Sequence, residues 1–191
     1  MLIIPIGFII LFTECKHSME KRGPAGSEER TLSSFSTIVL RGAGNLKITN
    51  GQDSHVKVNA PVNLLPMIET TVENDQLIIS MKNEFSLNDS KIDLDITTPT
   101  LKAVTVSGAG NVEIASFQVQ KMKLTLSGAG KIRFSNSECD SLFAILSGAG
   151  NMYVDVSDYL EANLKGVGNI EYHGDPTVNS KISGVGKVIK K

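Results

Sequence analysis

The chain has 191 residues and is close to electrically neutral, with 19 Lys and Arg residues against 20 Asp and Glu. Without an excess of basic charge it carries no electrostatic footprint for nucleic acid or for an anionic membrane surface. Aromatic residues make up 5% and tryptophan is absent, so few of the side chains that usually anchor tight interfaces are present. The composition excludes a nucleic-acid-binding protein and leaves the fold to patterns along the chain.

An apolar run, Met1–Thr13, opens the chain, and Cys15 follows it after one glutamate. A run of this length is too short to span a bilayer as a helix, so it predicts the apolar part of a secretion signal. A cysteine directly after such a run resembles the lipidation site of bacterial lipoproteins. Residues 1–15 are therefore predicted to be a lipoprotein signal with Cys15 as the lipidated residue. The alternatives are an uncleaved signal anchor and an ordinary secreted chain.

A charged segment with glycine, proline and serine follows at residues 16–30, and it is predicted to be a flexible tether. The folded domain is predicted to cover residues 31–191. If Cys15 carries lipid, Cys139 has no partner for an intramolecular disulfide. The protein is thus expected in the cell envelope, as an outer-membrane lipoprotein or as a secreted or periplasmic protein.

The first half of the domain, residues 31–100, predicts an irregular all-β arrangement. Apolar residues alternate on both sides of a glycine corner between Ser36 and Ile48, which predicts two short strands. Two further alternating runs, 68–72 and 77–81, flank Glu73-Asn74-Asp75 and predict a hairpin. At least some antiparallel pairing is therefore expected in this half.

The second half, residues 101–191, is built on a Gly-x-Gly repeat. The first glycines of its five copies stand at positions 108, 128, 148, 166 and 184, so the period is 20 at first and 18 after the third copy. An earlier copy precedes them at position 42. A fixed period of this size marks a repeat architecture in which each unit is one coil. Glycine supplies positive φ at tight corners, and these residues are the predicted corners: Gly42, Gly44, Gly108, Gly110, Gly128, Gly130, Gly148, Gly150, Gly166, Gly168, Gly184 and Gly186.

Aligned by this period, apolar residues fall into columns on both sides of each corner. Stacked coils with identical columns predict a right-handed parallel β-helix, or β-solenoid, with 18–20-residue coils. The register sets Phe134 inward, and it places Glu113 and Arg133 in one outward column, where an ion pair is expected. Ser180 and Lys190 replace apolar residues in the last coil, which predicts a polar cap.

The repeated Ser-Gly-Ala-Gly-Asn and Lys-Gly-Val-Gly-Asn motifs, together with Phe35–Ile38 and Leu101–Gly108, resemble the bacterial family described as putative auto-transporter adhesin, head GIN domain. The resemblance covers residues 31–191. It implies an exported, envelope-associated β-solenoid, typical of Bacteroidetes-like bacteria. The family offers no catalytic residues to carry over.

Two groups of residues are candidates for binding. Asn111, Asn151 and Asn169, with Asn45 before them, follow the corners and could contact sugars, although stacked amides also suit turn exits. Asp155, His173 and Asp175 come together when the coils are aligned and could bind a metal or serve acid–base chemistry. They fall in a Gly/Pro turn, however, where aspartate is common in any case.

Two further features are explained by structure. The Gly-x-Gly corners are followed by strands, whereas a phosphate-binding loop needs a helix. Cys139 aligns with Val119 in a predicted inward position, where a thiol behaves as a small hydrophobe.

The sequence therefore predicts a non-enzymatic envelope module that acts as an adhesin or a scaffold, with no cofactor, metal or catalytic residue assigned. A surface glycan or an envelope protein is the partner class considered, with membrane contact only through the lipid. One alternative is a polysaccharide-active enzyme, which needs outward carboxylates and basic residues on neighbouring coils. Another is a self-associating structural protein, or homo-oligomer, that packs through Ile145 and Tyr153.

Overall fold

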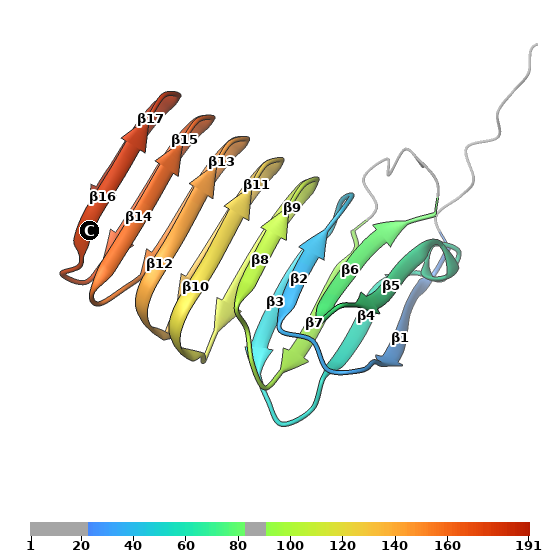
Figure 1. Cartoon of the computed structure of the whole chain (residues 1–191). Coiled ribbons are helices and arrows are strands. Elements are labelled where there is room, and N and C mark those ends of the chain that lie inside the picture. Colours follow the sequence, from blue (N-terminus) through green and yellow to red (C-terminus); the bar gives the residue numbers. More distant parts are fainter. Residues whose placement is uncertain (1–22, 83–90) are drawn as a thin grey trace, which may run out of the picture.

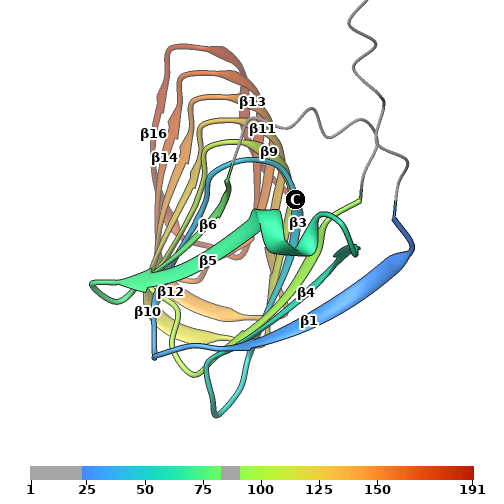
Figure 2. The same ribbon diagram turned by 90° about the vertical axis from the view of Figure 1, so that its right-hand side faces the viewer.

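The computed structural model describes residues 23–82 and 91–191, and it is built from two β-sheets that face each other across one core (Figures 1 and 2). The predicted signal, residues 1–15, and the lipidation site Cys15 lie outside the described residues. In the part described, no helix is long and apolar enough to cross a membrane.

Sheet A has nine strands in the order β1-β4-β7-β3-β9-β11-β13-β15-β17, and sheet B has eight in the order β16-β14-β12-β10-β8-β2-β6-β5. The strands of sheet A are β1 (Ala25–Thr31), β3 (Asn45–Asn50), β4 (His55–Pro61), β7 (Asp93–Thr98), β9 (Ala109–Ala115), β11 (Ala129–Ser135), β13 (Ala149–Asp155), β15 (Val167–His173) and β17 (Val185–Lys190). The strands of sheet B are β2 (Thr37–Leu40), β5 (Ile68–Glu73), β6 (Gln76–Met81), β8 (Ala103–Val106), β10 (Gln118–Leu126), β12 (Glu138–Leu146), β14 (Tyr159–Leu164) and β16 (Thr177–Ile182).

Each coil of the second half runs along sheet B, turns at a glycine corner, runs along sheet A and returns through an arc. Neighbouring coils pair in parallel with the register that the period predicts: Leu124 pairs with Val104 in the coil before it and with Ala144 in the coil after it. Where the period shortens, Leu142 pairs with Leu160, as the alignment of the shorter coil requires. The predicted all-β solenoid and its coil alignment are confirmed.

The first coil in the sequence, β2–β3, does not lie at the end of the stack. Ile38 pairs with Val104, and Leu46 pairs with Val112, so this coil contacts the β8–β9 coil directly. On its other side lie β6 and β7. The early glycine corner is therefore a regular member of the stack, and strands β4 to β7 extend the stack beyond it.

The N-terminal end of the stack carries the predicted antiparallel pairing. β5 and β6 form the expected hairpin through Asn74 and Asp75, which both have positive φ. β4 pairs antiparallel with β7 and with β1. A 3₁₀ turn, η1 (Leu65–Met67), links β4 to β5 and lies across this end, where Leu65 is buried (Figure 2).

The tether predicted for residues 16–30 was wrong in its last part, because β1 begins at Ala25. The guanidinium of Arg30 donates hydrogen bonds to the carbonyl oxygens of Leu65 (3.0 Å) and Ile68 (2.6 Å), and so joins β1 to the end of the stack. A charged segment without apolar alternation can pair as an edge strand because its stability comes from backbone and side-chain hydrogen bonds. The folded domain therefore starts before the predicted boundary at residue 31.

The inward columns form one continuous core. Phe134 is fully buried and pairs in register with Ile114 and Val154, as predicted. The core thins at the last coil, where Ser180 and Lys190 are exposed in positions that are apolar in the coils before. These polar residues fit the predicted cap, since an apolar end would favour continued stacking.

Glycine is needed at the corners for two different reasons. Gly130 has a φ of 139°, as the prediction of positive φ requires. Gly128 and Gly148 do not fall in that region, so conformation does not explain them. A Cβ on Gly148 would instead overlap the carbonyl oxygen of Gly128 in the neighbouring coil. At these two positions it is the close approach of stacked backbones that excludes a side chain.

Candidate functional site

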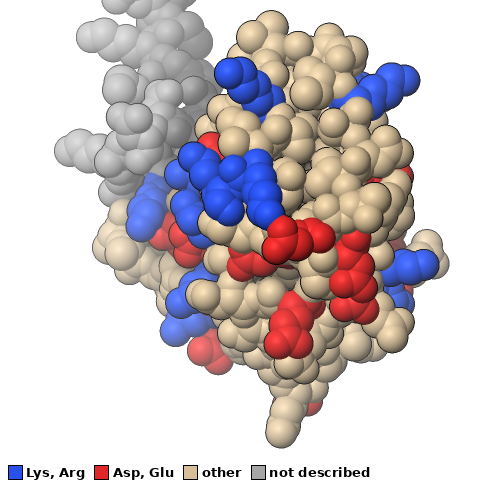
Figure 3. Space-filling view, turned by 90° about the vertical axis from the view of Figure 1, so that its left-hand side faces the viewer, with Lys and Arg blue, Asp and Glu red and all other residues tan. Residues whose placement is uncertain are grey.

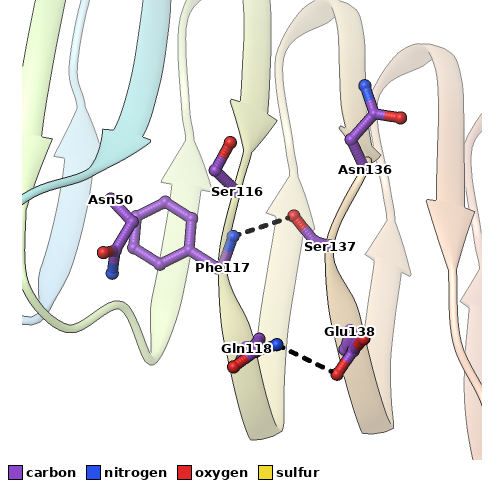
Figure 4. Close-up of a pocket in the computed structure, with 7 residues that line it drawn as sticks. All are labelled: Asn50, Ser116, Phe117, Gln118, Asn136, Ser137 and Glu138. Atoms are coloured by element: carbon purple, nitrogen blue, oxygen red, sulfur yellow. Dashed lines mark hydrogen bonds between the residues drawn. The ribbon is translucent and has the colours of Figure 1, made fainter.

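A hollow lies at the arcs of the two longer coils, those that begin at β8 and β10 (Figure 4). It encloses about 570 Å³, and we call it the arc pocket. Two short segments, 116–118 and 136–138, form its walls beside the end of β3. Its lining residues are Asn50, Ser116, Phe117, Gln118, Asn136, Ser137 and Glu138.

Hydrogen bonds between the two arcs fix the pocket walls. The amide nitrogen of Gln118 donates to the carboxylate of Glu138 (3.3 Å), and the Phe117 N–H donates to the hydroxyl of Ser137 (3.2 Å) (Figure 4). Phe117 is 1% exposed, so it is anchored in the core. The side chains left at the surface are amides, hydroxyls and one carboxylate.

The arcs of these two coils are two residues longer than the arcs that follow. Phe134 pairs with Val154, twenty residues on, whereas Ser141 pairs with Tyr159, eighteen residues on, so the shortening lies between Val154 and Tyr159. Insertions in solenoid repeats map to loops on one face, which is often the binding face.

Asp155 and His173 are brought together as predicted, but Asp175 is not part of their group. The two residues pair in register, with His173 Nδ1 3.3 Å from the Asp155 carboxylate. The other carboxylate oxygen of Asp155 accepts the Asn136 N–H (3.1 Å). Asp175 pairs instead with Lys190. Among the described residues, no group of three potential metal ligands is found.

Asp155 thus compensates for the change of period. One coil earlier, the Ser116 N–H donates to the backbone carbonyl of Asn136 in the next coil (3.1 Å). At the first coil with the shorter arc, the Asn136 N–H donates instead to a side chain, the carboxylate of Asp155. The carboxylate is therefore engaged in structural contacts on both sides.

The asparagine row is also engaged in contacts between coils. The side-chain oxygen of Asn151 accepts the Asn169 N–H (2.9 Å), and that of Asn169 accepts the Lys187 N–H (3.0 Å). Asn45 likewise accepts from the Asn111 N–H (3.3 Å). These side-chain oxygens serve as acceptors at the corner exits, and the NH₂ groups of Asn45 and Asn111 donate in turn to Asp93 (3.0 Å) and to Asn45 (3.2 Å).

Cys139 is buried, and it pairs in register with Val119. Burial and, second, the nearby charge of Asp140 raise the pKa of its thiol to about 11. The thiol is therefore protonated at neutral pH, whereas a nucleophile has to be a thiolate.

The outer face of sheet A carries a row of alternating charge, of which only the step from Glu113 to Arg133 was predicted from the sequence. The row crosses six strands, β1, β4, β7, β3, β9 and β11, and its members are Glu29, Lys57, Asp95, Lys47, Glu113 and Arg133. Part of it lines a second hollow, of about 510 Å³. Opposite charges on neighbouring strands stabilise a sheet modestly.

The expected Glu113–Arg133 ion pair was wrong, although the two residues pair in register. The Arg133 guanidinium lies instead over the ring of Tyr153 in the next coil, 4.8 Å from its centroid. Tyr153 attracts the cation through its π-electrons.

The end of the stack at β16 and β17, which faces the viewer in Figure 3, shows basic side chains in one patch beside acidic ones. Charge of a single sign therefore does not cover this end.

The outer face of sheet B carries an aromatic pair among polar and charged residues. Phe143 and Tyr159 pack edge to face with ring centroids 6.5 Å apart. Ile145, in register with Thr125, is half-buried.

Comparisons with known proteins agree with this architecture. The model of the family "Putative auto-transporter adhesin, head GIN domain" matches residues 34–144 and 115–176. No curated protein sequence matches the chain. Among solved structures, a putative adhesin from Bacteroides fragilis is similar with 19% identity and a TM-score of 0.61, over 88% of this chain and 97% of that one.

Two others cover the same share of this chain and 97% of their own. One is a putative adhesin from Parabacteroides merdae (17% identity, TM-score 0.49), and the other is a putative lipid binding protein from Parabacteroides distasonis (19%, 0.48). At these identities, structural likeness speaks for the fold alone. The family match covers more than half of the sequence, and the chain belongs to the head GIN domain family of auto-transporter adhesin-like proteins.

Proposed function

We propose that the protein is a non-enzymatic binding module of the cell envelope that holds a hydroxyl-rich ligand, such as a surface glycan, in the arc pocket. The observation that carries the proposal is the lining of that pocket. Gln118, Asn136 and Ser137 offer both donors and acceptors, which is the chemistry that hydroxyl groups require. The parallel coils hold these groups on a rigid frame, which lowers the entropic cost of binding.

Binding is favoured over catalysis by how the reactive groups are used. The Asp155 carboxylate accepts the Asn136 N–H and contacts His173, and the Cys139 thiol is buried with a raised pKa. Both groups are thus held in roles that stabilise the stack. The family name, which describes adhesins, points in the same direction.

Glu138→Ala is expected to weaken glycan binding at least about ten-fold, because it removes the pocket carboxylate and the acceptor that orients Gln118. Binding would be measured on a glycan array and then by titration with the strongest neutral glycan. Glu161→Ala is the matched control, since it removes the same charge from β14 of the same sheet, outside the pocket. If both variants bind like the unmodified protein, the arc pocket does not hold the ligand.

A second candidate, a polysaccharide-active enzyme, is favoured by one observation. The hollow on sheet A brings Asp93, Asp95 and Glu113 together with Lys47 and Lys91. Asp93 is already paired with Lys91 (3.1 Å), and Asp95 accepts a hydrogen bond from Asn59 (3.0 Å), so these carboxylates have structural partners. A turnover screen on acidic polysaccharides tests this candidate, and products released by the unmodified protein but not by Glu113→Gln would favour it.

For the envelope location, we propose that the chain is anchored by lipid on Cys15. Cys15→Ser is expected to move the protein from the membrane fraction to the soluble fraction, because a lipid-modified N-terminus is the membrane contact proposed. Fractionation and the mass of the mature N-terminus measure this directly. An unchanged distribution, with no lipid mass on the unmodified protein, would contradict the anchor.

A further inference from the structure

We propose that Lys131, Arg133 and Tyr153 form a second binding site, which takes a carboxylate of an acidic glycan. The site lies on the outer face of sheet A, apart from the arc pocket. Lys131 and Arg133 are two residues apart on β11 and therefore point to the same side of the sheet. Tyr153 stands on the next strand, β13, in register with Arg133.

The aromatic ring brings the two cations together. The Arg133 Cζ atom lies 4.8 Å from the ring centroid and the Lys131 Nζ atom lies 5.8 Å from it. Both cationic side chains are exposed, and Tyr153 is half-buried. A guanidinium that stacks on a ring keeps its planar edge free to donate two parallel hydrogen bonds to a carboxylate.

The carboxylates on the flanking strands β9 and β15, those of Glu113 and Glu171, do not form ion pairs with these two cations. Glu171, in register with Tyr153, forms an ion pair with Lys191 at 3.5 Å. Glu113, in register with Arg133, has Lys47 as its other neighbour. In the described part of the chain, no ion pair is formed by either Lys131 or Arg133. Lys131 and Arg133 therefore both contact the Tyr153 ring and have no ion-pair partner in the described part of the chain.

The surroundings favour a carboxylate on a glycan over a continuous anionic surface. A membrane or a nucleic acid would also meet Glu113 on β9 and Glu171 on β15, which flank the site and would repel an anionic surface. A single carboxylate among hydroxyl groups fits between them. Asn151 lies beside Lys131, and because its side-chain oxygen already accepts the Asn169 N–H, its NH₂ group can donate to a sugar hydroxyl.

The test is calorimetric titration of the full chain with tetragalacturonate and with its methyl ester. The acid form is expected to bind, with an affinity that falls as salt is raised, and the ester is expected to bind at least ten-fold more weakly. Lys131→Ala/Arg133→Ala should lower the affinity for the acid form at least ten-fold. Both residues are exposed, so the variant should fold normally, and its thermal unfolding checks this.

The matched control is Lys121→Ala/Lys123→Ala, which removes the same charge at the same spacing from β10 of the opposite sheet. It should bind tetragalacturonate within two-fold of the unmodified protein. The proposal is overturned if the acid form does not bind at millimolar concentration, if the ester binds equally well, if the control weakens binding as much, or if phosphatidylglycerol vesicles bind in its place.

Discussion

Gly148→Ala is expected to lower the free energy of unfolding by about 3 kcal/mol or more, although it adds only one methyl group. The new Cβ would overlap the backbone carbonyl of Gly128, and no side chain can turn aside to relieve the contact. Relief requires that the two coils move apart, which stretches the hydrogen bond from the Ala149 N–H to the same carbonyl oxygen (2.9 Å). The corner glycines of the later coils, Gly166 and Gly184, approach the carbonyl oxygen of the preceding coil just as closely.

The control for this prediction is Ala149→Val, one residue further on. Ala149 is exposed and pairs in register with Val167, so the chain itself carries valine at this position in the next coil. It should change the free energy of unfolding by less than about 0.5 kcal/mol, as exposed substitutions usually do. Chemical denaturation of both variants gives the comparison, and equal stabilities would contradict the close-approach explanation.

Phe134→Ala is expected to destabilise the protein by about 3–5 kcal/mol, the usual cost of removing a buried aromatic ring. Phe134 is 0% exposed and lies between Ile114 and Val154 in a column with rigid backbone on both sides, so the cavity cannot collapse easily. Denaturant unfolding followed by circular dichroism measures the loss.

Arg133→Ala provides the matched control, since its side chain is on the opposite face of the same strand. It removes the contact with Tyr153, which is worth about 0.5–1 kcal/mol at an exposed site. A slip of one residue in the coil register would exchange the two positions. A larger loss for Arg133→Ala than for Phe134→Ala would therefore refute the register.

The regular part of the solenoid was predictable because its information is local and periodic. Side chains one period apart repeat the same inward or outward choice, so aligning the corners placed Phe134 and Cys139 inside without knowledge of the fold. The hairpin at Asn74 and Asp75 was predictable for the same reason, since turn chemistry is a property of a few adjacent residues.

Features that depend on contacts between distant segments were missed. No period places β2–β3 against β8–β9, because the strands between them in the sequence, β4 to β7, lie on the other side of β2–β3. For this reason, the part of the charge row that crosses β7 and β3 could not be predicted from the sequence. β1 was missed because its apolar contacts are few, and it is held by Arg30, whose partners Leu65 and Ile68 are distant in the sequence.

The arc pocket had a signal in the sequence that was not used. The two longer coils differ from the later ones by two residues in the arc. The consequence of this difference depends on side chains such as Gln118 and Glu138, which meet only when the coils stack. The contact of Lys131 and Arg133 with Tyr153 was missed for a different reason, because the register alone favoured Glu113 as the partner of Arg133.

The most direct test of the proposed binding site is the amide ¹H–¹⁵N spectrum of the full chain, titrated with the neutral glycan that binds most strongly on an array. The arc pocket predicts that the amides of residues 116–118 and 136–138 shift together and with one dissociation constant, while those on the outer face of sheet B around Phe143 stay in place. Shifts confined to sheet B, or no saturable shift with any glycan, would contradict the proposal that the arc pocket holds the ligand.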